Sequence, residues 1–351
     1  MNRKNLISAA FFLVLLTATI VVIFQGNDMN TVVAAMQTLS PVYLVAAALT
    51  ALFFTSAEGI MIWYLLGSLE GKTPLFSCIK YSFVGFFYSG ITPSATGGQP
   101  MQLYYMQKEG HKVSDSSVVL MTVAVVYKLV LALMGVAILL FYRTQLMGYL
   151  GNYIYLYYLG LFLNTALVVI LLFVMISPRC FKSLVLGGEA VLKKLHILKK
   201  SGKRKEKLIE MADQYHEAVV FLIGHKNKIA FVLILTFIQR CSVFFMTWLI
   251  YKGMGLTGES VLSIMILQAS VYIAVDMLPL PGGMGISETL FLKIFPPVFG
   301  STLLLPAMVL SRGLGYYGEL LVSAVFTVVA QLTIGNTKRE KRGGTTYDRV
   351  L

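Results

Sequence analysis

The chain has 351 residues, of which 57% are hydrophobic and 13% are charged, and its formal net charge is +13. This composition excludes a soluble globular domain, because several apolar runs approach or exceed the ~20 residues that a helix needs to cross a bilayer. The runs are continuous and lack the alternation that marks a membrane β-barrel. We therefore expect an all-α polytopic integral membrane protein.

The excess positive charge lies outside the apolar runs, so it indicates topology and contact with anionic lipid headgroups rather than nucleic acid. The three cysteines and four histidines have no metal-binding or disulfide spacing. The sequence also lacks a P-loop and a dinucleotide fingerprint. We expect no metal, no cofactor and no catalytic residues.

Six apolar segments are long enough to cross a membrane, and the first follows Arg3 and Lys4 without a convincing signal-peptide cleavage site. We expect about six full spans. They are Leu6–Phe24, Pro41–Leu66, Val113–Phe141, Tyr153–Ile176, Ile229–Tyr251 and Leu303–Ile334.

Two further apolar segments are interrupted by helix breakers. Leu75–Ser89 runs into Ile91-Thr-Pro-Ser-Ala-Thr-Gly-Gly-Gln-Pro100, and Val261–Met277 runs into Met277-Leu-Pro-Leu-Pro-Gly-Gly-Met-Gly-Ile-Ser-Glu288. We call these the first and second breaker segments. Their arms are short, so we predict two re-entrant helical hairpins. Irregular backbone at membrane depth is tolerated where it is buried in protein or lines a wet cavity.

One long polar stretch, residues 179–228, holds 12 Lys or Arg against 5 Asp or Glu. Its apolar residues recur at helical spacing from Leu208 to Leu222, which predicts an amphipathic helix on the membrane surface. We expect a single transmembrane domain over residues 1–337 and a basic tail over 338–351. The Lys and Arg excess puts both termini and this loop in the cytoplasm of a multi-pass cell-membrane protein.

The two breaker segments belong to a longer repeat. Trp63 and Gly97 are 34 residues apart, as are Trp248 and Gly282. Lys128 follows Gly98 by 30 residues, and Arg312 follows Gly283 by 29. Residues 41–141 and 229–334 therefore form two units, which the predicted topology orients in opposite directions. Such inverted repeats are typical of transporters, whose substrate sites lie where broken helices meet.

Charged residues within or beside the apolar segments should face a cavity or one another. One interpretation is mutual pairing that locks the bundle. The other is a polar substrate site, in which Lys128 and Arg312 hold a phosphate and Glu288 caps a helix or contacts an amine. The candidate substrate-binding residues are Glu58, Pro93, Gly97, Gly98, Gln99, Gln102, Lys128, Arg240, Asp276, Pro281, Gly282, Gly283, Glu288, Arg312 and Glu319.

Four motifs resemble one known family. Pro93-Ser-Ala-Thr-Gly-Gly-Gln and Leu278-Pro-Leu-Pro-Gly-Gly-Met-Gly-Ile-Ser-Glu288 resemble the signature loops of the lysylphosphatidylglycerol synthase transmembrane region. Val126-Tyr-Lys128 and Val309-Leu-Ser-Arg312 are similar to its basic span motifs. This region is the flippase-like membrane part of the multiple peptide resistance proteins. Many members carry an acidic residue and an arginine where this chain has Gln99 and Gln102.

The resemblance implies movement of a phospholipid or lipid-linked substrate, anionic or aminoacylated like lysylphosphatidylglycerol, between leaflets. The family's aminoacyl-transferase domain has no counterpart in these 351 residues, so we expect no transferase activity. Two alternatives stay open: a lysyltransferase or other lipid-modifying transferase (or a membrane subunit of one), and a structural membrane partner. The expected partners are membrane phospholipids, a lipid-modifying enzyme and a second copy of the chain, but no nucleic acid.

Overall fold

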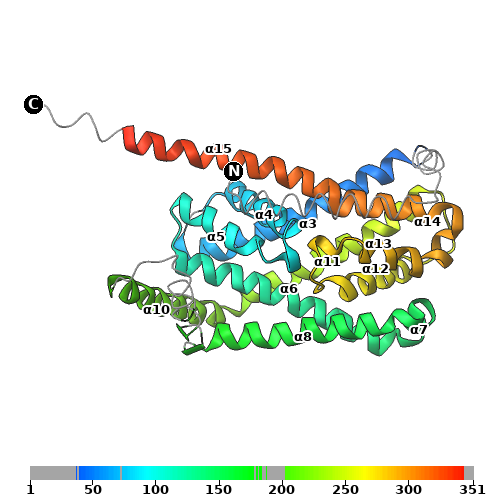
Figure 1. Ribbon diagram of the computed structural model, residues 1–351, viewed down its shortest axis with the longest axis horizontal. Coiled ribbons are helices and arrows are strands. Elements are labelled where there is room, and N and C mark those ends of the chain that lie inside the picture. The colour runs from blue at the N-terminus through cyan, green and yellow to red at the C-terminus, as the bar shows by residue number, and fades with distance from the viewer. Residues whose placement is uncertain are drawn as a thin grey trace, which may run out of the picture.

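The computed structural model describes residues 37, 39–71, 73–177, 179–180, 182–183, 187 and 202–343, with side chains left out for 202–212 and 334–343. Every regular element in these ranges is helical (Figure 1). The α-helices are α3 (Pro41–Glu70), α4 (Leu75–Gly90), α5 (Gly98–Glu109), α6 (Val113–Phe141), α7 (Arg143–Leu150), α8 (Ile154–Ile176), α10 (Gly202–Gly224), α11 (Lys226–Gly253), α12 (Val261–Val275), α13 (Ile286–Ile294), α14 (Pro296–Arg312) and α15 (Glu319–Gly343).

Five helical segments in the described ranges are long and apolar enough to cross a membrane. They match the predicted second to sixth spans, while the predicted first span, Leu6–Phe24, lies outside the described residues. The chain is therefore a membrane protein built from a helical bundle. The five segments are Pro41–Glu70, Val113–Phe141, Arg143–Ile176, Lys226–Gly253 and Pro296–Thr333.

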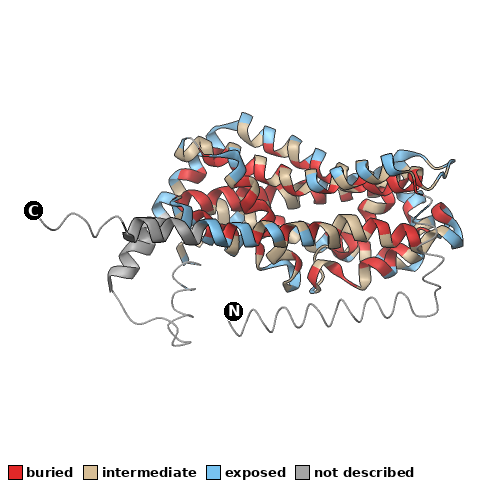
Figure 2. Cartoon of the chain, turned by 90° about the horizontal axis from the view of Figure 1, so that it is seen from above, coloured by how far each residue is buried: buried red, intermediate tan, exposed pale blue. Residues whose placement is uncertain are grey.

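The outer surface of the bundle is apolar, as lipid contact requires. Buried residues gather on the inward faces of the helices, and exposed residues line the outward faces (Figure 2). The exposed side chains of α8 and α15 are mostly large hydrophobics. They include Tyr155, Phe162, Val169, Ile170, Phe173, Leu321, Val325, Val328 and Leu332.

Two pairs of short helices flank the breaker segments. The pair α4 and α5 has 16 and 12 residues, and the pair α12 and α13 has 15 and 9. The members of each pair pack against each other. The first pair occupies the left half of the bundle in Figure 1 and the second pair occupies the right half. The two breaker segments therefore approach each other from opposite ends.

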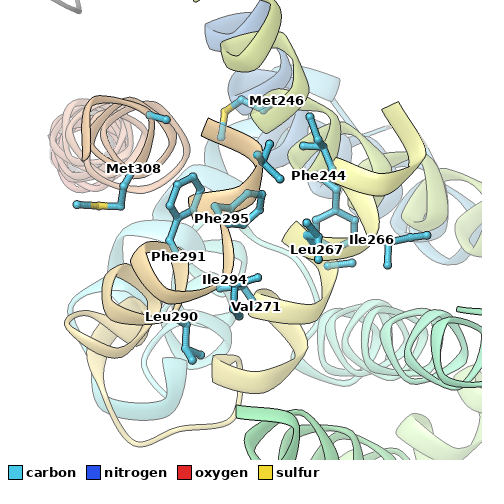
Figure 3. Packing of buried hydrophobic residues seen from close by; sticks show 14 of the residues in the cluster. Phe244, Met246, Ile266, Leu267, Val271, Leu290, Phe291, Ile294, Phe295 and Met308 are labelled. Carbon is cyan, nitrogen blue, oxygen red and sulfur yellow. The ribbon is translucent and has the colours of Figure 1, made fainter. Parts of the chain in front are cut away.

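Each helix pair has its own apolar core. One cluster of buried residues joins α3, α4, α5, α6 and α10. The other joins α8, α11, α12, α13 and α14, and its centre is a stack of aromatic rings (Figure 3). The rings of Phe291 and Phe295 lie 4.2 Å apart. The Phe291 ring also lies 5.8 Å from the Phe299 ring, so the aromatic packing joins α13 to α14.

The amphipathic helix α10 packs against protein. Tyr215, Val219 and Leu222 are buried in the same core as α6, which α10 contacts. The described part of the predicted apolar face, from Tyr215 to Leu222, is therefore covered by the bundle. Val220 and Ile223 stay exposed for lipid contact.

The last span is interrupted at a glycine-rich stretch. The α-helix α14 changes at Gly313–Gly318 to a π-helical turn, η4, before α15 begins. Such π turns bend helices and often mark functional sites. The structure also starts this segment earlier than predicted, at Pro296, because Pro is well suited to the first turn of a helix.

Candidate functional site

The two breaker segments contain the same backbone turn. Each forms a short 3₁₀ turn, η1 (Pro93–Ala95) and η3 (Pro281–Gly283). The residue before each proline is extended, with φ near −116° for Thr92 and −117° for Leu280. The two residues after each proline are left-handed, at φ 52° and 55° in the first turn and 56° and 67° in the second.

The shared conformation differs from the pairing that the predicted repeat gave. The sequence paired Gly97–Gly98 with Gly282–Gly283, whereas the backbone conformation of Gly282–Gly283 is found at Ser94–Ala95. Gly97 instead precedes α5, as Gly285 precedes α13. The two glycine pairs therefore have different roles. Gly282–Gly283 occupies the two left-handed positions after the proline, whereas Gly97–Gly98 leads into α5.

Gly98 is needed for close packing within the first helix pair. A Cβ atom there would lie 2.1 Å from the Ser89 hydroxyl and 2.8 Å from the Gly85 carbonyl oxygen. Gly282 is needed for packing between distant elements, because a Cβ atom there would lie 2.0 Å from the Tyr316 ring of η4.

The two turns lie against each other. Turn η1 contacts η3, and α4 contacts η3 as well. Tyr316 ties them together: its ring packs on Gly282, and its hydroxyl donates to the Gly90 carbonyl at 2.8 Å. A tyrosine from the last span therefore bridges the end of α4 and the second turn.

The second turn is held by a buried ion pair. The Arg312 Nε atom lies 2.8 Å from Glu288 Oε1, and Nη2 donates to the Gly282 carbonyl at 3.0 Å. Tyr317 donates to the same carboxylate oxygen at 3.1 Å, and the other oxygen accepts from the Gly285 N–H at 2.8 Å. The Glu288 carboxylate therefore has partners on both oxygens and lies at the N-terminus of α13, where negative charge is favoured.

A second ion pair fixes the start of the second breaker segment. Lys128 of α6 pairs with Asp276 and also donates to the Met277 sulfur at 3.3 Å. Tyr127 donates to Asp276 Oδ1 at 3.3 Å and shares a hydrogen bond of 2.6 Å with the Tyr272 hydroxyl. Both predicted phosphate-binding cations are therefore paired with acids of the second segment.

Four more candidates lie on the first helix pair's side of the site. The Gln102 amide donates to Glu58 Oε1 at 2.6 Å, and Thr55 donates its hydroxyl hydrogen to Glu319 Oε1. Arg240 of α11 interacts electrostatically with both acids and with Asp276, and its guanidinium contacts aromatic rings. These contacts bring helices α3, α5, α11 and α15 to one polar cluster.

The tip of the first segment is more exposed than the rest of the predicted site. Pro93 and Gln99 are exposed, whereas Pro281 and Gly283 are buried. The structure thus gathers the candidate residues along the second segment and the adjoining helices, and it leaves the first tip open.

Sequence reasoning missed the tyrosines of the site. Tyr127, Tyr272, Tyr316 and Tyr317 each connect a charged or backbone group of the site to another helix. A usable signal was present, since a tyrosine inside an apolar span usually needs a hydrogen-bond partner for its hydroxyl.

Within the described ranges, no three His, Cys, Asp or Glu side chains gather as a potential metal site.

Comparison with known proteins identifies the chain at family level. No curated protein matches the chain. The family model described as the lysylphosphatidylglycerol synthase TM region matches residues 5–323. The chain therefore belongs to the lysylphosphatidylglycerol synthase transmembrane-region family.

Proposed function

We propose that this protein moves a phospholipid or lipid-linked molecule with an anionic or aminoacylated headgroup between the two leaflets. The observation that carries the proposal is the meeting of two broken-helix turns beside buried ion pairs. Turns η1 and η3 share one backbone conformation and touch each other. Transporters place substrate sites where discontinuous helices meet near the bilayer midplane.

Helix length supports two re-entrant hairpins. At 1.5 Å per residue, the 16-residue α4 is about 24 Å long and the 15-residue α12 is slightly shorter. Both are shorter than the ~30 Å hydrocarbon core, and their partners α5 and α13 are shorter still. Each pair would enter the membrane and leave on the same side.

The shared turn supports an inverted repeat of units 41–141 and 229–334. In such a repeat, rocking of one unit against the other would expose the site to each leaflet in turn. The basic stretch 179–228 supports a cytoplasmic position for that loop and for both termini, by the excess of Lys and Arg on the cytoplasmic side.

The ion pairs favour a headgroup with both a phosphate and an ammonium group. A phosphate can take the place of Asp276 beside Lys128 and of Glu288 beside Arg312. The Arg312 guanidinium can bind it in a bidentate manner. The carboxylates that are released then need a cation. An amine-bearing phospholipid supplies both charges, so it leaves no buried charge without a partner.

Lipid exchange in proteoliposomes tests the proposal. Vesicles would carry fluorescent phosphatidylglycerol, lysylphosphatidylglycerol or a polyprenyl phosphate, and an impermeant quencher would report the outer leaflet. We expect exchange to be faster than in empty vesicles, and fastest for the lysylated lipid. No acceleration with any of these lipids would overturn the translocase proposal.

Matched variants separate site chemistry from folding. Lys128→Gln and Arg312→Lys should slow exchange, whereas Arg143→Gln removes a charge from an exposed position and should leave exchange unchanged. Normal exchange by folded Lys128→Gln and Arg312→Lys would contradict the roles assigned here. Formation of lysyl-lipid on addition of lysyl-tRNA would instead support the transferase alternative.

A further inference from the structure

Arg240 is a buried cation with incomplete hydrogen bonding. Its side chain is among the largest that are fully buried, at 1% exposure. Nη1 donates to the Tyr272 hydroxyl at 3.2 Å, but Nε and Nη2 have no partner among the residues that the structure describes. Leaving a charged donor unsatisfied in a protein interior is costly.

Aromatic rings surround the guanidinium without replacing those bonds. The centres of the Tyr127 and Phe54 rings lie 3.8 and 4.3 Å from its central carbon. Cation–π contacts offset part of the desolvation cost, yet they offer no acceptor for an in-plane N–H group. Arg240 is therefore held in place with two donors available.

Two carboxyl groups lie within the field of Arg240. Glu58 of α3 and Glu319 of α15 both interact electrostatically with its guanidinium, and Glu319 also interacts with Glu58. Each accepts a hydrogen bond at Oε1 from an uncharged side chain: Glu58 from Gln102 and Glu319 from Thr55. Oε2 of Glu319 is buried without a partner in the described part of the chain.

The charges of this cluster do not balance. Lys128 and Asp276 pair with each other, which leaves one arginine facing two carboxyl groups. An uncompensated charge in a low-dielectric interior costs several kcal/mol. One proton on either Glu58 or Glu319 restores neutrality.

In the described part of the chain, Arg240 is the one cation that acts on the two carboxyl groups. Besides these two acids, the charged or titratable groups that act on Arg240 are Tyr127 of α6, Tyr272 of α12 and Asp276. From α4, Lys80 and Tyr81 bind Glu109, and Tyr88 faces Tyr104. The side chain of α5 that reaches the cluster, Gln102, is neutral.

We propose that Arg240 binds the phosphate of a lipid headgroup through Nε and Nη2, and that the Glu58–Glu319 pair takes up one proton when it does. This inference rests on the proposed translocation and names its coupling ion. A phosphate that occupies Arg240 leaves both carboxyl groups without a cation. Phosphate binding therefore favours the second proton, and by reciprocity the proton favours phosphate binding.

Infrared titration of the protein in lipid nanodiscs tests the protonation directly and without transport. The signal is the C=O band of a protonated carboxyl group, followed against pH. We expect phosphatidylglycerol nanodiscs to shift this titration to higher pH than maltoside detergent micelles with added inorganic phosphate do. Because the micelles contain no lipid phosphate, this comparison separates a lipid headgroup from free phosphate. Glu58→Gln and Glu319→Gln should each remove part of the signal, while Glu217→Gln, at an exposed position of α10, should not.

The same variants in the exchange assay connect protonation to movement. Wild-type exchange should accelerate as pH falls, by up to about tenfold per pH unit for one linked proton. The Glu58→Gln/Glu319→Gln double variant should lose this dependence, and Arg240→Lys should retain part of it. Because glutamine preserves the shape of glutamate, these variants keep the hydrogen bonds from Thr55 and Gln102.

The outcomes distinguish the two proposals. Exchange that is present but independent of pH overturns proton coupling and leaves translocation standing. Absent exchange together with a lipid-dependent carboxyl titration overturns translocation and supports the linked binding of phosphate and proton. Identical infrared titrations for wild type and the double variant overturn the assignment to Glu58 and Glu319.

Discussion

The two breaker segments have one backbone design in two chemical settings. Both turns place two left-handed residues after a proline, but the first uses Ser94 and Ala95 and the second uses Gly282 and Gly283. The first turn is exposed, while Pro281 and Gly283 of the second are buried. Left-handed backbone costs ~1–2 kcal/mol in a residue with a Cβ atom and almost nothing in glycine.

The helix that follows each turn repeats this difference. The N–H of Gly97 donates to the Thr92 hydroxyl at 2.9 Å, and the equivalent N–H of Gly285 donates to the Glu288 carboxylate at 2.8 Å. Arg312 then pairs with that carboxylate. The turn therefore gives the two segments their common shape. Charge makes the second segment a fixed anchor, whereas the first segment is a strained, neutral tip.

The largest effect should come from Arg312→Gln. This change leaves the Glu288 carboxylate buried without its cation and removes the bond to Gly282. Breaking one partner of a buried pair typically costs ~3–5 kcal/mol. Unfolding followed by circular dichroism in detergent should show this loss, and Arg143→Gln, at an exposed position, should show almost none.

Adding Glu288→Gln to Arg312→Gln sharpens the result. The double variant should recover part of the lost stability, because the uncompensated charge is gone. Additive losses would mean that the two side chains act independently and that the second segment lacks the proposed anchor.

Gly282→Ala should have the next largest effect. Gly300→Ala is the matched control: Gly300 has φ 66° and open space around its Cβ position, whereas Gly282 has φ 56° and faces the Tyr316 ring. The control should cost ~1–2 kcal/mol for left-handed strain alone. Gly282→Ala should cost ~1–3 kcal/mol more from overpacking. Equal losses in thermal unfolding would disprove the contact with Tyr316.

A smaller loss is expected for Thr92→Val in the first segment. The variant removes the acceptor of the Gly97 N–H and the hydrogen bond to the Tyr88 carbonyl, both of which are neutral. We expect a loss of ~1 kcal/mol, measured by thermal unfolding. A loss as large as that of Arg312→Gln would contradict the distinction between anchor and tip.

The smallest effect, and the only gain, should come from Ala95→Gly. Glycine relieves the left-handed strain at φ 55°, partly offset by greater freedom of the unfolded chain. We expect stability to rise by up to ~1 kcal/mol in the same unfolding experiment. A decrease would show that this residue does not hold the left-handed conformation.

Sequence alone predicted the parts of the molecule that depend on hydrophobic length and on helix breakers. Five of the six predicted spans lie in the described residues and match long apolar helices there. The breaks at Pro93 and Pro281 were visible because prolines and glycines interrupt helices wherever they occur. The family resemblance was also confirmed.

The pairing of side chains could not be predicted in the same way. The predicted repeat paired Gly97–Gly98 with Gly282–Gly283, because Ser94 and Ala95 are not residue types that usually adopt the left-handed conformation they have here. Which acid accompanies Lys128 depends on contact between α6 and the end of α12, two segments far apart in the sequence. Composition restricts the candidates, but tertiary contact selects among them.

A reversible cross-link between the two tips tests the central claim most directly. One cysteine at Ser94 and one at Leu280, in a chain with its three native cysteines replaced, would be joined by a cleavable bis-thiosulfonate reagent in proteoliposomes. We predict efficient cross-linking, arrested lipid exchange, and recovery of exchange after reduction. Failure to cross-link, or undiminished exchange by the cross-linked protein, would contradict it.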